Sequence, residues 1–185
     1  MVNSWKGDSL NLRLLRGDMP FSATAVANDF LKIASDNASP LTSMKLQKLV
    51  YFSHGWSLAL AGDPLIFNRI EAWDYGPVIP DLYQDFKRYG NEPIAKPVQE
   101  WTIRDRKIVL ITPTVENCPR DPERIGAQKI IERVWQQYGK FTAARLSNAT
   151  HAEGTPWAQV YKPGQRNILI PNTIIKAYFE TLVHG

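Results

Sequence analysis

The sequence has little of what anchors a protein in a membrane or stabilises it covalently. A single cysteine, Cys118, stands among 185 residues, so no disulfide can form within the chain. That composition is typical of proteins in a reducing compartment. No apolar run approaches the roughly 20 residues that cross a bilayer, and residues 1–20 lack the hydrophobic stretch of a signal peptide. We therefore expect a cytoplasmic protein with no membrane partner.

Neither positive nor negative residues are present in large excess. The 22 lysines and arginines face 18 acidic residues, which leaves a net charge of +4. The densest basic stretch, Arg104, Arg106 and Lys107, is interrupted by Asp105. Proteins dedicated to nucleic-acid binding usually cluster their basic residues. The charge pattern therefore permits contact with nucleic acid but does not predict it.

Motifs of familiar enzymatic chemistry are absent as well. The sequence has no P-loop, no Gly-x-Ser-x-Gly and no dinucleotide-binding glycine pattern. His54, His151 and His184 do not fall at metal-ligand spacing, and Cys118 has no activating motif beside it. A hydrolase using His151 with Glu153 is an alternative, although a histidine just after a helix more commonly satisfies terminal carbonyls. We expect no catalytic residue, no metal and no cofactor.

What the sequence does contain is apolar residues at helical spacing, 44% of the chain being hydrophobic. This spacing predicts helices at about 22–36, 42–61, 80–88, 121–138, 142–150 and 171–182. Short alternating stretches predict one or two strands within 65–73 and a hairpin within 98–112, while 74–77 is expected to be a turn and 151–166 a loop. We predict a mainly α fold of the α+β class: a compact single-domain bundle of about six helices with a small antiparallel β element.

The sequence also predicts that the chain is divided into a leader and one domain. Residues 1–20 are broken by Gly7 and Gly17 and closed by Pro20, which predicts a weakly structured leader. Residues 21–185 are expected to form one domain, in which 98–112 is a β-hairpin insertion.

The predicted helix at 42–61 is apolar on more than one side, as in a helix buried between layers. Gly55 within it costs about 1 kcal/mol relative to alanine. We therefore expect a neighbouring element to approach Gly55 closely.

Two blocks of the sequence resemble a known family. The first joins MKLQKLVYF at 44–52 and Gly55-Trp56 with EAWDYGPV at 71–78, and the second is LSNATHAEGTPW at 146–157. Their order and spacing are similar to those of the Panacea domain, known as the SocA-like antitoxin or GepA phage-associated domain. The resemblance extends from about Ala25 to Phe179.

The resemblance implies an antitoxin of a toxin–antitoxin pair, often carried by phage or other mobile DNA. It implies neutralisation by direct protein contact, no enzymatic activity and no cofactor. The expected partner is a protein toxin encoded by an adjacent gene, with a homo-oligomer also open and nucleic acid not expected. Two alternatives remain: a DNA-binding regulator of its own operon, and an adaptor that presents a client protein to a protease. Residues 1–20 and 98–112 lie outside the matching blocks, and we expect partner choice to reside in such variable parts.

The blocks also single out candidate contact residues. Trp and Tyr dominate binding hot spots, and polar or charged side chains bury poorly unless they are paired. The predicted partner-binding residues are Lys45, Gln47, Lys48, Tyr51, Trp73, Tyr75, His151, Glu153 and Trp157. The alternative for each of them is structural, because buried polar groups form hydrogen bonds inside a fold and the 73–77 turn is able to dock on the 42–61 helix.

Overall fold

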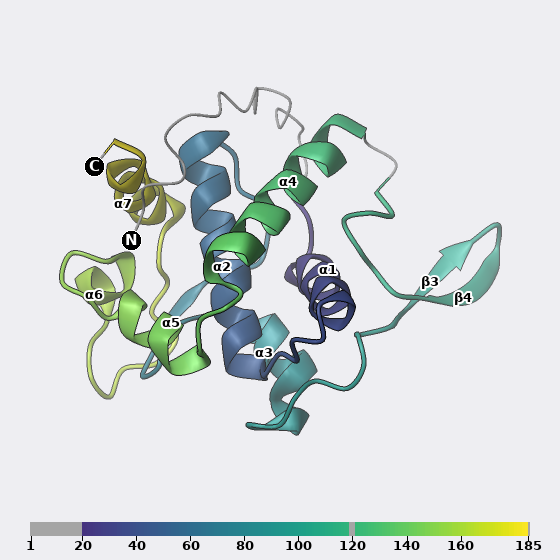
Figure 1. Ribbon diagram of the computed structural model, residues 1–185, viewed down its shortest axis with the longest axis horizontal. Helices are drawn as coiled ribbons and strands as arrows, with labels where there is room; N and C mark the ends of the chain where they lie inside the picture. The colour runs from purple at the N-terminus through teal and green to yellow at the C-terminus, as the bar shows by residue number, and fades with distance from the viewer. Residues whose placement is uncertain (1–19, 119–120, 185) are drawn as a thin grey trace.

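The computed structural model describes residues 20–118 and 121–184 (Figure 1). The predicted leader, apart from Pro20, lies outside the described residues. The described chain is mainly helical with two small antiparallel strand pairs, so the predicted fold class is confirmed. Its α-helices are α1 (Ala23–Asp36), α2 (Ser43–Leu60), α3 (Pro80–Phe86), α4 (Asp121–Tyr138), α5 (Ala143–Thr150), α6 (Pro156–Val160) and α7 (Asn172–His184). None of these helices combines the length and apolar character needed to cross a bilayer.

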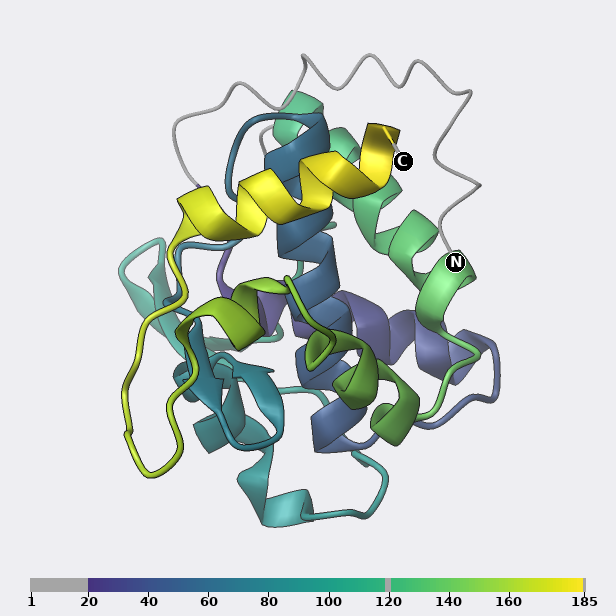
Figure 2. The ribbon, with the colours of Figure 1, turned by 90° about the vertical axis from the view of Figure 1, so that its left-hand side faces the viewer.

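Helix α2 forms the centre of the molecule, with α1, α4, α5 and α7 packed around it (Figures 1 and 2). The side-chain oxygen of Thr42 caps its first turn by accepting a hydrogen bond from the Lys45 N–H at 3.4 Å. Residues 46–58 are all buried, which explains why the helix is apolar on more than one side. The polar side chains along it are therefore enclosed and must find hydrogen-bond partners within the fold.

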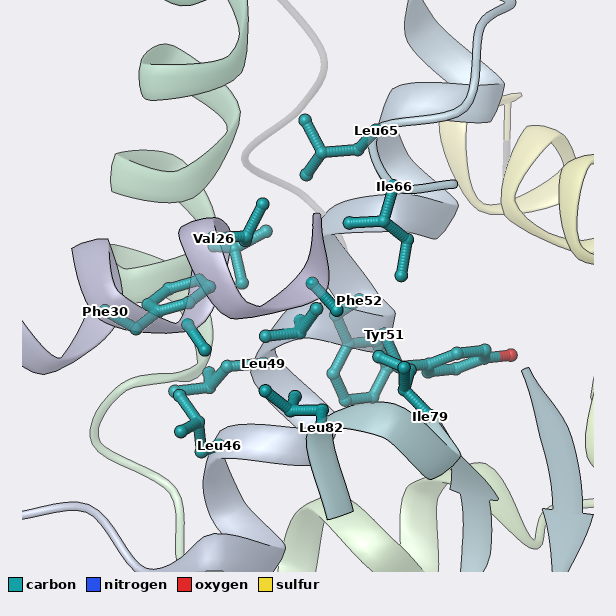
Figure 3. Close-up of a cluster of buried hydrophobic side chains, with 14 of the residues drawn as sticks. Val26, Phe30, Leu46, Leu49, Tyr51, Phe52, Leu65, Ile66, Ile79 and Leu82 are labelled. Atoms are coloured by element: carbon teal, nitrogen blue, oxygen red, sulfur yellow. The ribbon is translucent and has the colours of Figure 1, made fainter. Parts of the chain in front are cut away.

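The hydrophobic core fills the space between α2 and its neighbours (Figure 3). On one side, Phe30 of α1 and Leu82 of α3 lie with Leu49 of α2 in this core. On the other side, Trp56 of α2 meets the ring of Phe179 of α7 edge-on, with 5.3 Å between the ring centroids. The core therefore continues through α2 from one helical layer to the next.

Gly55 lies where α2 meets α7. A β-carbon at this position would overlap the ring of Phe179, which is fully buried. The expected close approach to Gly55 is confirmed. Burial of the Phe179 ring offsets the helix-propensity cost of this glycine.

Two local predictions were wrong. Strand β1 (Glu71–Trp73) pairs with β2 (Gly76–Val78), so Gly76 and Pro77 belong to a strand and the turn consists of Asp74 and Tyr75 alone. Helix α6 interrupts the loop expected at 151–166. Its start carries a standard helix signal, because Thr155 accepts a hydrogen bond from the Ala158 N–H and a proline occupies the first turn.

Strands β3 (Glu100–Arg104) and β4 (Lys107–Ile111) form the predicted hairpin, which projects from the helical body (Figure 1). Asp105 and Arg106 at its tip have φ angles of 50° and 61°, the left-handed geometry that two-residue hairpin turns require. The division of the chain into a leader and one domain stays a prediction.

Candidate functional site

The β1–β2 turn lies between α2 and the α5–α6 segment, where the two sequence blocks meet. The carbonyl oxygen of Tyr75 accepts hydrogen bonds from Lys48 Nζ at 2.6 Å and from Ser147 Oγ at 2.9 Å. Lys48 Nζ also donates to the carbonyl of Pro77 at 3.0 Å. The backbone of the turn is thereby attached to a helix on each side.

His151 and Trp157 hold the same turn from the α5–α6 side. His151 Nδ1 lies 2.7 Å from the carbonyl oxygen of Ser147, and Nε2 lies 3.2 Å from that of Asp74. Trp157 packs edge-on against the imidazole at 4.0 Å and donates from Nε1 to the carbonyl of Trp73 at 2.8 Å. Carbonyl oxygens only accept, so a neutral ring satisfies one of them and a protonated ring satisfies both.

This arrangement bears on the hydrolase alternative. The polar partners of the His151 ring are backbone carbonyls, whereas Glu153 is exposed on the segment that follows. A general base needs a free nitrogen lone pair within reach of a substrate proton. The contacts of His151 therefore favour the structural role over the catalytic one.

Gly76 permits the close packing of the turn. Its φ of 98° is one that residues with a side chain rarely adopt. A β-carbon there would come within 2.5 Å of Thr150 Oγ1 and 2.7 Å of Lys48 Nζ. Any other residue at this position would push the turn away from both helices.

Lys48 is the least expected member of this cluster, because only 1% of it is exposed. Within the described part of the chain, the hydrogen-bond partners of its amine are carbonyl oxygens and not carboxylates. Burial lowers the pKa of the amine to about 7, so it is neutral for part of the time at physiological pH. Its evident role is to fasten the turn to α2.

Three more predicted contact residues on α2 also face inward. The Gln47 amide accepts from the Ile79 N–H at 3.0 Å and donates to the Ile79 carbonyl at 3.2 Å, which satisfies both backbone groups of that residue. Tyr51 is enclosed, and burial raises the pKa of its hydroxyl well above the usual value. Half-buried Lys45 donates to the carbonyl of Gly139 at 2.6 Å. This burial favours the structural alternative, and a contact role for these side chains stays a prediction.

Other predicted residues do reach the surface. Tyr75 is 70% exposed at the tip of the turn, and Glu153 is exposed beyond α5. The half-buried ring of Trp73 meets Tyr83 edge-on, with 5.0 Å between the centroids. These aromatic side chains form the outer surface of the turn.

A cavity of about 800 Å³ opens beside the turn, between the start of α2, the end of α3 and the 164–167 loop. Aromatic and cationic side chains contribute to its wall, and these are Trp73, Tyr75, Tyr83, Lys48, Lys87 and Arg166. No three His, Cys, Asp or Glu side chains converge to hold a metal ion anywhere in residues 20–118 and 121–184.

Sequence reasoning missed three residues of this site. Ser147 and Asp74 lie inside the two blocks, but their hydrogen bonds to the rest of the cluster were not foreseen. Tyr161 donates to Asp74 Oδ1 at 2.9 Å and stacks on Trp157 with 4.3 Å between the ring centroids. The spacing of four residues between Trp157 and Tyr161 is the signal in the sequence that points to this pair.

Comparison with known proteins supports the resemblance found in the two blocks. The family model described as "Antitoxin SocA-like, Panacea domain" matches residues 46–158, which include most of α2, the β1–β2 turn, α5 and the start of α6. Antitoxin SocA of Caulobacter vibrioides (strain NA1000 / CB15N) is 36% identical over 135 residues, covering 73% of this chain and 68% of that protein. No solved structure matches the chain. The chain therefore belongs to the SocA-like antitoxin family with a Panacea domain.

Proposed function

We propose that this protein is an antitoxin that neutralises a protein toxin by binding it directly. Family membership and similarity to a protein named antitoxin SocA support the antitoxin role. The observation that carries direct binding is the convergence of both family blocks on the β1–β2 turn. There Lys48, His151 and buried Trp157 bond to the backbone of the turn, while exposed Tyr75 and half-buried Trp73 lie on its outer side.

The proposed contact surface is the outer side of that turn together with the adjacent cavity. Tyr75 and Trp73 supply large side chains of the kind that dominate binding hot spots, and Glu153 adds a charge nearby. Lys48 and His151 hold the backbone of the turn from beneath. A turn held in one conformation binds with a smaller loss of conformational entropy than a mobile loop.

The proposal also concerns where the toxin is encoded and where both proteins act. We expect the toxin to be encoded by an adjacent gene, on phage or other mobile DNA, and both proteins to act in the cytoplasm. The protein acts without enzymatic turnover in this scheme, so neutralisation should follow the stoichiometry of the complex.

Expression of the adjacent gene, alone and with this protein, tests the proposal. We expect growth arrest by the toxin alone, restored growth on co-expression, and co-purification of the two proteins. Tyr75→Ala should raise the Kd of the complex by about tenfold or more, equivalent to at least 1.4 kcal/mol. Phe67→Ala is the matched control, since Phe67 is 64% exposed and lies outside the cavity wall. A toxic neighbour that is neither rescued nor bound would contradict the proposal.

A further inference from the structure

Helix α1 holds both ends of the β3–β4 hairpin through two consecutive buried side chains. Asn28 Oδ1 accepts from the Val98 N–H at 3.0 Å, and Asn28 Nδ2 donates to the carbonyls of Val98 at 3.0 Å and Pro113 at 2.8 Å. Asp29 Oδ2 accepts from the Val115 N–H at 2.9 Å. Asn28 and Asp29 are 2% and 7% exposed, respectively. The base of the hairpin is therefore fixed to the helical body from both sides.

Beyond this base, one face of the hairpin is apolar and exposed. Trp101 pairs with Leu110, and Ile103 pairs with Ile108. Residues paired directly across an antiparallel ladder project from the same face, so the four side chains form one patch. Their exposed fractions are 72%, 44%, 73% and 73% in that order, and we call this patch the apolar ribbon face.

An exposed apolar face on such an element is unusual in a protein that acts alone. Two-stranded hairpins are marginally stable in water without a hydrophobic face packed on something else. A contiguous apolar patch on a surface commonly marks an interaction site. Here the base is firmly attached, the hairpin projects from the helical body (Figure 1), and the apolar side chains on it are exposed. That combination is typical of an element presented to a partner.

The size and charge of the hairpin indicate which kind of partner its apolar ribbon face fits. A stable dimer buries about 800 Å² per subunit, which four side chains on five-residue strands do not supply by themselves. The tip at 104–107 carries three basic residues and one acid, a formal charge of +2 from the sequence. Duplex DNA would meet the basic tip but would leave the apolar ribbon face uncovered. A protein groove that is apolar inside and acidic at one end matches both features.

An exposed stretch of chain also connects the cavity wall to the hairpin. Gly90 and Asn91 line the cavity beside the turn, and the chain from there to Pro97 is exposed except at Ile94. This segment leads directly into β3 at Glu100. A partner seated at the cavity can therefore follow the chain to the hairpin.

We propose that the β3–β4 hairpin inserts its apolar ribbon face into an apolar groove of the toxin, with acidic groups of the toxin around the basic tip. The proposal rests on the proposed function and extends it, because it names a second contact element and the chemistry of the surface that receives it.

The test compares binding of the purified product of the adjacent gene to four full-length proteins. Ile103→Thr/Ile108→Thr removes apolar surface but keeps β-branched side chains, and we expect the Kd to rise at least tenfold. Val109→Thr is the control, since Val109 pairs with Thr102 on the opposite face, and its Kd should stay within threefold of wild type. Arg106→Glu/Lys107→Glu should slow association, most strongly at low salt. Thermal unfolding confirms that each protein is folded.

The outcomes separate this proposal from the one on which it rests. If wild type binds the product and the Ile103→Thr/Ile108→Thr protein binds it equally well, the hairpin proposal is overturned and the proposed function stands. If wild type does not bind at all, the proposed function fails first. A homodimer abolished by the double threonine change with toxin binding intact would assign the face to a second copy. Salt-sensitive binding of operon DNA that depends on the basic tip, with toxin binding intact, would assign it to DNA.

Discussion

The ring of Phe179 on α7 lies against the backbone of Gly55 on α2, in the space that a β-carbon would fill. The same ring meets Trp56 edge-on and is fully buried. The distance between α2 and α7 is thus set by the absence of one side chain.

Replacing Gly55 by alanine should destabilise the protein. In an open helix this change would stabilise by about 1 kcal/mol. Here the added methyl group collides with an enclosed ring, and overpacking of this kind costs about 1–3 kcal/mol. We expect a lower free energy of unfolding in urea. Gly55→Ala/Phe179→Leu is the control, because the smaller side chain makes room and the two effects should not add. A Gly55→Ala protein as stable as wild type would contradict this packing.

His54 should make the protein less stable as the solution becomes acidic. Its Nε2 lies 2.9 Å from Asn172 Oδ1 and its Nδ1 accepts from the Ile66 N–H at 3.3 Å, a pattern that the neutral ring satisfies. Burial lowers its pKa from 6.5 to about 4, and the contact with Asn172 opposes this only in part. The folded protein therefore binds this proton less readily than the unfolded chain. The stability that His54 contributes is present above pH 6.5 and is lost as the pH falls toward 4.

Denaturant unfolding of wild type and His54→Gln between pH 4.5 and 7.5 measures this loss. Relative to the variant, wild type should lose up to about 1.4 kcal/mol per pH unit below pH 6.5. Parallel pH profiles for the two proteins would show that His54 is not held neutral.

Asp29 should have the opposite dependence on pH. Burial raises its pKa from 3.8 to about 6, while the hydrogen bond from the Val115 N–H opposes the shift. The folded protein binds this proton more readily than the unfolded chain, so its contribution to stability falls as the pH rises from 4 to 6 and is constant above 6. Asp29→Asn keeps an acceptor for Val115 without the charge. The stability of this variant relative to wild type should increase across that window, as measured by urea unfolding, and a constant difference would refute the assignment.

A substitution at Gln47 tests whether the polar side chains of α2 stabilise the fold or contact a partner. Gln47→Glu removes the donor to the Ile79 carbonyl and buries a carboxylate, which should cost about 2–4 kcal/mol of stability at neutral pH. Gln84→Glu, at an exposed position of α3, is the matched control and should change stability by less than about 0.5 kcal/mol. A Gln47→Glu protein with wild-type stability and lost toxin binding would instead support the predicted contact role.

Much of the fold could be predicted because its signals are local. Ser22, Thr42 and Thr142 each cap a helix within three residues of their own position, so sequence pattern alone placed those helix starts. The β3–β4 hairpin was likewise evident from alternation on either side of a short turn. Helix α6 was missed because its five residues are too few for apolar periodicity, although Thr155 carried the capping signal.

The inward orientation of Lys48 and Gln47 was harder to predict. Lys48 bonds to carbonyls 27 and 29 residues away, and Gln47 bonds to the backbone 32 residues away. Backbone carbonyls belong to every residue type, so no particular side chain in the sequence marks them as partners. The sequence blocks include Lys48, Tyr75 and His151, which meet at the turn, but nothing in the pattern shows which side chains support the turn and which face outward.

The attachment of the hairpin to α1 has a consequence for how this protein can change. All four hydrogen bonds at its base reach main-chain atoms of Val98, Pro113 and Val115. Main-chain partners place no demand on the side chains of the 99–112 segment. The side chains of that segment can therefore be substituted while the helical body stays the same. We expect a hairpin transplanted from a relative of different specificity to fold on this body and to transfer recognition of the donor's toxin, which binding measurements on the chimera would reveal.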